Sequence, residues 1–183
     1  MYSKNYSTEG VVLARRNYGE ADRIVSIYTK HFGRLSYMAK GIRKPTSRKR
    51  ASLEIFSSVS FLAHKGRSLD LITETQTLET FRSIRKSLSR VALAYFFCEV
   101  IGKITREAEK NEELYNLLLK YLNELKTSRR LRTLRHNFSY DVLILLGFLP
   151  RGKPPPDMDS VLESVLERGL SSLRVGKKLL KPD

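Results

Sequence analysis

The chain has 183 residues, 41% of them hydrophobic, which is enough for one sizeable domain or two small ones and excludes a chain disordered by composition. Lysine and arginine number 34 against 19 acidic residues, and the resulting formal net charge of +15 indicates affinity for nucleic acid or for an anionic membrane. A basic ribosomal-type structural protein is the third class that this charge allows.

No apolar run approaches the ~20 residues that span a bilayer, and the N-terminal stretch MYSKNYSTEG lacks the apolar segment of a signal peptide. We therefore expect a cytoplasmic protein that does not act at a membrane. The single cysteine, Cys98, allows no internal disulfide, and its place on an apolar helix face predicts a core position. Three scattered histidines and one cysteine give no spacing typical of a zinc site.

Residues 1–80 alternate between short β-branched runs and turns, which predicts about five strands. The runs are EGVVLARR, DRIVSIYT and GRLSYMA, followed by residues 53–63 and 69–75 at period two. Strands this short avoid exposed edges best by closing into a small barrel. A longer, basic connection between the third and fourth strands favours an OB-type barrel, and an SH3-like barrel is the alternative that the pattern leaves open.

From about residue 81 the apolar period becomes helical, so we predict an α-helical domain over residues 81–183 after a barrel domain over residues 1–80. The clearest apolar stripe runs from Leu114 to Leu125, with Asn111 as N-cap. An earlier helix is marked by Leu88, Val91, Tyr95, Cys98 and Ile101, and a later one by Leu131, Leu134, Phe138, Val142, Leu145 and Leu146. The fold class is therefore α+β, a five-stranded barrel followed by a helical bundle.

The third of these helices is closed by Gly147 and Pro150, and a proline-rich connector follows at residues 150–157. The stretch SVLESVLERG predicts a last amphipathic helix. Ser160 and Glu163 have capping-box spacing at its start, and Gly169 suits its end.

The stretch AKGIRKPTSRKR carries the densest positive charge and no acid. Gly41 and Pro45 prevent regular structure, so we expect a flexible loop at the barrel rim whose cations contact phosphates. The alternative is a solvated loop that only aids solubility. The candidate nucleic-acid-binding residues of the barrel are Arg15, Arg16, Arg23, Arg34, Lys40, Arg43, Lys44, Arg48, Lys49 and Arg50.

A second cationic set opens a predicted helix in the stretch SRRLRTLRH. Positive charge at a helix start opposes the helix dipole, so these side chains need either an intramolecular carboxylate or an anionic partner. The sequence leaves both alternatives open. The set completes the candidate nucleic-acid-binding residues with Arg129, Arg130, Arg132 and Arg135.

Aromatic residues lie among or beside the strands, where they either stack on bases of a single strand or fill the barrel core. They are Tyr18, Tyr28, Phe32, Tyr37 and Phe56. Most of them suit the core, and Tyr18 is the best stacking candidate because it lies in a turn.

Catalytic interpretations find little support in the sequence. Glu20 and Asp22 are the one carboxylate pair that suggests a metal-dependent nuclease, but nucleases need more carboxylates than this part of the chain supplies. Pairing with Arg15, Arg16 or Arg23 explains them better. The stretch IGKIT lacks the upstream glycine of a P-loop. We therefore expect no enzyme activity, no catalytic residue, no cofactor and no metal.

The stretch EGVVLARRNYGEADRIVSIYTKHFGRLSYMAKGIRKPTSR resembles the N-terminal OB domain of the bacterial RecO family of DNA repair and recombination mediator proteins. The stretches LITETQTLETFRSIRKSLSRVALAYFFCEVI and LRHNFSYDVLILLGFLP continue the resemblance, which covers roughly residues 8–170. Many members follow the second stretch with four zinc-binding cysteines. Here RGKPPPDMDS contains none, so anything that the family does through its zinc module is in doubt.

The resemblance implies a nucleoid-associated mediator that binds single- and double-stranded DNA and anneals complementary strands. It also implies an interaction with the acidic C-terminal tail of single-strand-binding protein. Further implied partners are RecR, often also RecF, and through them RecA, which such proteins load at gaps. The alternative from the residues alone is a basic structural module that binds RNA or another polyanion.

Overall fold

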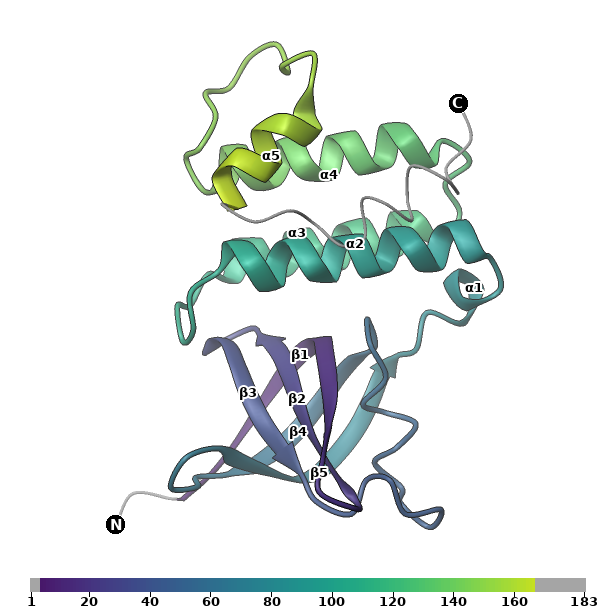
Figure 1. Cartoon of the computed structure of the whole chain (residues 1–183), viewed down its shortest axis with the longest axis vertical. Coiled ribbons are helices and arrows are strands. Elements are labelled where there is room, and N and C mark those ends of the chain that lie inside the picture. The colour runs from purple at the N-terminus through teal and green to yellow at the C-terminus, as the bar shows by residue number, and fades with distance from the viewer. Residues whose placement is uncertain (1–3, 167–183) are drawn as a thin grey trace. The chain divides into compact units, whose positions relative to one another are not determined.

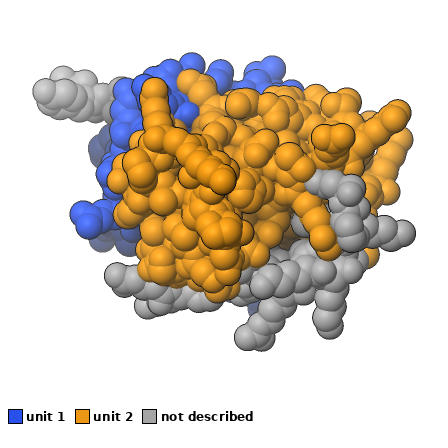
Figure 2. All heavy atoms as spheres, turned by 90° about the horizontal axis from the view of Figure 1, so that it is seen from above, with its two compact units in different colours: residues 1–80, 105–115 blue, residues 81–104, 116–183 orange. Residues whose placement is uncertain are grey.

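The structure is a computed structural model that describes residues 4–166. It divides into two compact units (Figure 2). The first contains residues up to 80 together with residues 105–115, and the second contains residues 81–104 and those from 116 onward. The predicted end of the last helix at Gly169 lies outside the described residues.

The first unit is a closed barrel of five strands in the order β1-β2-β3-β5-β4 (Figure 1). The strands are β1 (Asn5–Tyr18), β2 (Asp22–Thr29), β3 (Gly33–Ala39), β4 (Ser58–His64) and β5 (Asp70–Glu79). All pairings are antiparallel except that of β3 with β5. The predicted OB-type barrel followed by helices is confirmed.

The barrel interior is filled by side chains that recur at period two along the strands. Val25 and Ile27 of β2 face Tyr37 of β3 and Phe61 of β4 in one buried cluster, in which the Tyr37 and Phe61 ring centroids lie 4.9 Å apart. This alternation is the pattern from which the strands were predicted.

The fourth strand begins at Ser58, and the predicted start at Leu53 is wrong. Residues 53–57 are turns in which Phe56 adopts a left-handed backbone conformation with φ of 56°. The amide of Phe56 donates to the Val12 carbonyl at 2.7 Å. Leu53 and Phe56 are nevertheless buried. Their burial in turns imitates the period of a strand, which explains the error.

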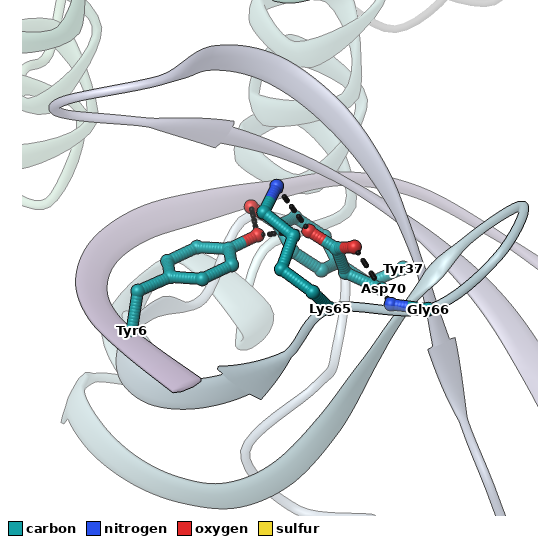
Figure 3. A network of polar contacts seen from close by, with 5 residues as sticks. All are labelled: Tyr6, Tyr37, Lys65, Gly66 and Asp70. Carbon is teal, nitrogen blue, oxygen red and sulfur yellow. Dashed lines mark hydrogen bonds and ion pairs between the residues drawn. The ribbon is translucent and has the colours of Figure 1, made fainter. Parts of the chain in front are cut away.

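Closure of the barrel depends on a short parallel contact, in which only Tyr37–Asp70 and Met38–Leu71 pair. A polar network reinforces it (Figure 3). The Tyr6 hydroxyl donates to Asp70 Oδ2 at 2.5 Å, the Lys65 ammonium lies 3.0 Å from the same oxygen, and the Gly66 amide donates to Oδ1 at 3.1 Å. One carboxylate thus joins β1, the β4–β5 turn and β5.

Residues 105–115, a connection between two helices together with the first turn of the second one, contact the β2–β3 end of the barrel unit. Arg34 donates twice to the Thr105 carbonyl, at 3.1 and 3.3 Å, and the Ala108 amide donates to the Arg34 carbonyl. The Tyr28 hydroxyl donates to the Asn111 carbonyl at 3.2 Å. A Cβ at position 33 would collide with the Glu109 backbone, so Gly33 permits this close approach.

The helical elements are α1 (Arg82–Arg85), α2 (Leu88–Ile104), α3 (Glu112–Leu125), α4 (Leu131–Leu145) and α5 (Met158–Leu166). In the second unit an aromatic group forms much of the core, with the Phe97 and Phe138 centroids 4.2 Å apart and Tyr121 5.3 Å from Phe138. Buried Cys98 lies on α2 as predicted. Leu88 and Tyr95, which helped to mark this helix, are 68% and 42% exposed, whereas Cys98 and Ile101 of the same set are buried, so only part of the predicted face of α2 lies in the core.

The helix ends test the predicted caps. Asn111 Oδ1 accepts the Leu114 amide at 2.9 Å, which confirms the N-cap of α3. Gly147, with φ of 78°, ends α4 in a Schellman motif in which the Phe148 amide donates to the Leu143 carbonyl at 2.8 Å. The capping box at Ser160 is wrong, because α5 begins at Met158 and Asp157 accepts the Ser160 amide at 3.1 Å.

The Asp70 network predicts a pH-dependent stability. Burial alone would raise the pKa of Asp70, but hydrogen bonds from Tyr6, Lys65 and Gly66 outweigh it and hold the pKa below its usual value. Asp70→Asn should lower the free energy of unfolding at pH 7 by about 1–3 kcal/mol. A carboxyl with a depressed folded pKa contributes its stability above the unfolded value of about 4 and loses it as the pH falls further.

The difference between Asp70→Asn and wild type should therefore shrink in urea titrations at pH 3 compared with pH 7. Glu74→Gln is the matched control, since Glu74 is exposed on the same strand. A difference of equal size at both pH values would contradict this role of the carboxylate.

Candidate nucleic-acid interface

The basic segment, residues 40–57, is a series of turns held by local hydrogen bonds, so the predicted flexible loop has a defined path. The Ser47 amide donates to the Lys44 carbonyl at 3.0 Å, and the Leu53 amide donates to the Lys49 carbonyl at 3.2 Å. Ile42 and Leu53 are fully buried in the barrel core and anchor the segment from within.

The basic segment is also joined to the β1–β2 turn. The Gly41 amide donates to Asp22 Oδ1 at 2.7 Å, and the Arg43 amide donates to the Ala21 carbonyl at 2.9 Å. The Arg43 guanidinium reaches the Gly19 carbonyl at 3.1 Å. The turn and the segment therefore form one continuous surface at this end of the barrel.

Most candidate cations of this surface are exposed. Exposed side chains are Arg16, Lys40, Arg43, Lys44, Arg48 and Arg50. Lys49 differs, because it is half-buried and its ammonium donates to the Ile72 carbonyl at 3.2 Å. Burial lowers the pKa of Lys49. The Lys49 ammonium is thus engaged with the barrel backbone rather than fully available to a ligand.

Arg15 and Arg23 lie on the inner face of the sheet at the same end of the barrel. Arg23 continues the inward-facing series of Val25 and Ile27, and Arg15 pairs with Val25 across the β1–β2 ladder. We call these two positions, with Asn17, the barrel mouth. Asn17 pairs with Arg23 in the ladder, and its Oδ1 accepts the Arg23 Nε–H at 3.2 Å.

The barrel mouth is strongly cationic. Arg15 forms an ion pair with Glu54 of the basic segment. Burial lowers the pKa of Arg23, and the neighbouring charges of Arg15, Arg50 and Arg43 lower it further, while Glu54 opposes them. Arg23 Nη1 is buried and has no hydrogen-bond partner among the described residues. The cations on β1, β2 and the basic segment therefore form one arginine cluster, Arg15, Arg23, Arg43 and Arg50.

Arg34 lies apart from this cluster, at the β2–β3 turn. Its guanidinium donates to the Thr105 carbonyl, so its hydrogen-bonding capacity is used in holding residues 105–115. The length of β2, at about 3.3 Å per residue, separates the β2–β3 turn from the β1–β2 turn.

The arginines of the second unit divide into two groups. Arg135 Nη2 lies 2.5 Å from Asp159 Oδ1, its guanidinium carbon is 4.5 Å from the Phe96 ring centroid, and its side chain is 17% exposed. For Arg135 the intramolecular carboxylate is thus the observed partner. Arg129, Arg130 and Arg132 are exposed.

The aromatic candidates also divide. Tyr28, Tyr37 and Phe56 are buried, and burial raises the pKa of Tyr28 and of Tyr37 to about 12. Tyr18, predicted in a turn, is the last residue of β1, where it pairs with Asp22, and it is 52% exposed. Phe32 is 39% exposed, and its ring packs edge-on against Tyr6 at 4.9 Å.

The carboxylates do not gather into a metal site. Within residues 4–166, no group of three histidine, cysteine, aspartate or glutamate side chains is placed to hold a metal ion. Asp22 accepts the Gly41 amide, whereas the sequence suggested an arginine partner. No helix in this part of the chain has the length and apolarity needed to cross a membrane.

The sequence did not predict the contacts of Glu54 and Asn17 with the arginines or the inward position of Arg23. Glu54 and Asn17 contact the arginines only after folding, and nothing in the sequence pairs them. The inward position of Arg23 had a signal, because it falls in period with Val25 and Ile27. A cation at the end of an apolar alternation is the pattern that indicates it.

Comparison with known proteins identifies two family models on this chain. The N-terminal model of recombination protein O matches residues 1–81, and the C-terminal model of recombination protein O matches residues 85–153. Relatives named DNA repair protein RecO from Pelotomaculum thermopropionicum and Rubrobacter xylanophilus are each 38% identical over 147 residues, or 80% of this chain. A relative of the same name from Listeria monocytogenes is 31% identical over 142 residues, or 78% of this chain.

The matched regions cover 57%, 59% and 56% of those three relatives. The chain therefore spans less than two thirds of the length of the curated relatives that it matches.

The Arg135–Asp159 contact predicts a structural role for one arginine of the second cationic set. Arg135→Met should lower the free energy of unfolding by about 2–4 kcal/mol, because it leaves a partly buried carboxylate unpaired and removes the contact with Phe96. Arg129→Met removes the same charge from an exposed position and should change stability by less than about 0.5 kcal/mol. Chemical denaturation measures both; equal stability of the two variants would contradict the assignment.

Proposed function

Because the chain belongs to the RecO family, we propose that it is a non-enzymatic DNA repair protein that binds single- and double-stranded DNA and anneals complementary strands. The observation that carries the proposal is the continuous cationic surface formed by the β1–β2 turn and the basic segment. This surface lies on an OB-type barrel, a fold that binds single strands.

The physical basis of annealing is electrostatic. Two DNA strands repel each other, and cations that neutralise phosphates on both strands lower the repulsion and raise their local concentration. Exposed Lys40, Lys44 and Arg48 supply mobile charge for many strand arrangements without selecting a sequence. Exposed Tyr18 adds a ring on which an unpaired base can stack, worth about 1–3 kcal/mol.

The proposed partners follow from the family. We propose that the protein works with RecR, and in some settings with RecF, to load RecA on DNA coated by single-strand-binding protein. Arg129, Arg130 and Arg132 are exposed and would accept the acidic C-terminal tail of single-strand-binding protein. Arg34 and Arg135 are left out of both surfaces, since their guanidinium groups are engaged within the protein.

A double substitution tests the DNA surface. Lys44→Gln with Arg48→Gln should reduce the slope of log affinity against log salt for single-stranded DNA by about 1.4, because each lost phosphate contact removes about 0.7. The matched control is Arg106→Gln with Lys110→Gln, which removes equal charge from exposed residues near the β2–β3 turn. Fluorescence anisotropy across a salt series gives the slopes, and an unchanged slope in the test variant would refute the assignment.

Strand annealing distinguishes the mediator from the alternative basic scaffold for RNA or another polyanion. The wild-type protein should accelerate duplex formation from complementary strands, and the Lys44/Arg48 variant should do so more slowly than the Arg106/Lys110 variant. Binding without any acceleration would favour the scaffold.

A peptide of the single-strand-binding protein tail tests the second cationic set. Arg129→Gln with Arg130→Gln should weaken binding of the peptide, with a larger effect at low salt, because rim charges act through screened attraction. Arg82→Gln with Lys86→Gln is the matched control, since both residues are exposed in the same unit. Equal retention of the peptide by both variants in a pull-down would place the tail elsewhere.

A further inference from the structure

The barrel mouth contains a buried donor that nothing in the described chain satisfies. Arg23 Nη1 is shielded from solvent and has no hydrogen-bond partner there, although Arg23 Nε is held by Asn17 Oδ1. More than nine in ten buried polar groups in proteins have a partner, and an unpartnered charged donor is especially unfavourable. Asn17 thus holds one nitrogen of the Arg23 guanidinium, while Nη1 has no acceptor among the described residues.

The charges around this donor decide which acceptor suits it. Arg15, Arg43 and Arg50 all act on Arg23 with like charge, and Glu54 is the carboxylate that opposes them. Glu54 is already paired with Arg15, and the nearby carboxylate of Asp22 accepts the Gly41 amide. A water molecule would accept the hydrogen bond but leave the repulsion between guanidinium groups. An anion would accept the hydrogen bond from Arg23 and would also offset the repulsion between the guanidinium groups.

We propose that the barrel mouth is a built site for one phosphate group, with Arg23 as its anchor and Arg15, Arg43 and Arg50 around it. Guanidinium groups match the oxygens of phosphate in a planar, two-pronged manner that lysine cannot reproduce. The site differs from the exposed lysines of the same surface, because Nη1 of its central guanidinium is buried and Asn17 accepts the neighbouring Nε–H. The proposal deepens the proposed DNA-binding function and rests on it for the source of the phosphate.

Two parts of a nucleic-acid strand present this chemistry. An internal phosphodiester carries one negative charge, and a terminal phosphate carries about −1.5 to −2 at pH 7. Seating either group would place the strand at one fixed point of the surface, beside exposed Tyr18, while its other phosphates contact exposed cations.

Inorganic phosphate and pyrophosphate test the site without nucleic acid. At constant ionic strength both should raise the melting temperature of the wild-type protein, because an anion that binds only the folded state stabilises it. Arg23→Met should abolish the rise, and Arg106→Met, an exposed charge loss near the β2–β3 turn, should preserve it. Arg50→Met should weaken the response as well. Since Arg50 is exposed, this second variant tests the site even if Arg23→Met fails to fold.

Oligonucleotides with a 5′-phosphate or a 5′-hydroxyl identify the source. Arg23→Met should weaken binding by about tenfold, the effect of losing a charge-assisted contact, whereas Arg106→Met should not. A loss confined to the 5′-phosphorylated strand assigns the site to a terminal phosphate, and an equal loss for both strands assigns it to an internal one.

The outcomes separate this proposal from the proposed function. A phosphate response that Arg23→Met abolishes and Arg50→Met weakens, in a protein that binds no DNA, would support the site and refute the function. DNA binding by the wild type with no phosphate response, and with equal DNA affinity in Arg23→Met, Arg50→Met and Arg106→Met, would overturn the site and leave the function standing.

Discussion

The parallel pairing of β3 with β5 is the constraint on which the rest of the barrel depends. Strands that run parallel in one sheet need a crossover of about a dozen or more residues. β5 lies between β3 and β4 in the barrel, so the chain that leaves β3 at Ala39 first forms β4 and only then β5. The basic segment is the first part of this connection, at the end of the barrel where β3 stops. Topology therefore requires a long connection at this position, and composition makes it cationic.

The same end of the barrel combines firm anchoring with unfavourable charge. Ile42 and Leu53 are buried in the core, and the Asp22 carboxylate accepts the Gly41 amide, so the path of the basic segment is fixed. Arg15 and Arg23 nevertheless occupy inward positions where apolar side chains would stabilise the fold more. Repulsion between such groups persists only where packing enforces it. A rigid scaffold thus holds like charges together, which is the condition for pre-organised anion binding.

A structural feature could be predicted from the sequence where the interaction behind it is local, and could not where the partners are distant in sequence. Val25 and Ile27 alternate because one face of β2 is buried, so the strand could be predicted, and Asn111 and Gly147 act through local backbone geometry. Leu53 and Phe56 are buried in turns, where period two arises without a strand. Leu88 and Tyr95 are apolar but exposed, because α2 carries apolar residues around much of its circumference. The partners of Arg15, Arg34 and Arg135 lie far away in sequence, and no local pattern pairs Arg135 with Asp159.

Residues 105–115 belong with the barrel although helices precede and follow them, so the chain passes between its two units at three points, after residues 80, 104 and 115. A barrel encoded by residues 1–80 alone would lack the strand-end partner of Arg34 and the acceptor of Tyr28. The segments that encode the two units therefore alternate along the gene. A single recombination event after codon 80 would not transfer an intact barrel to another protein, and inheritance as a linked pair is the arrangement that preserves both units.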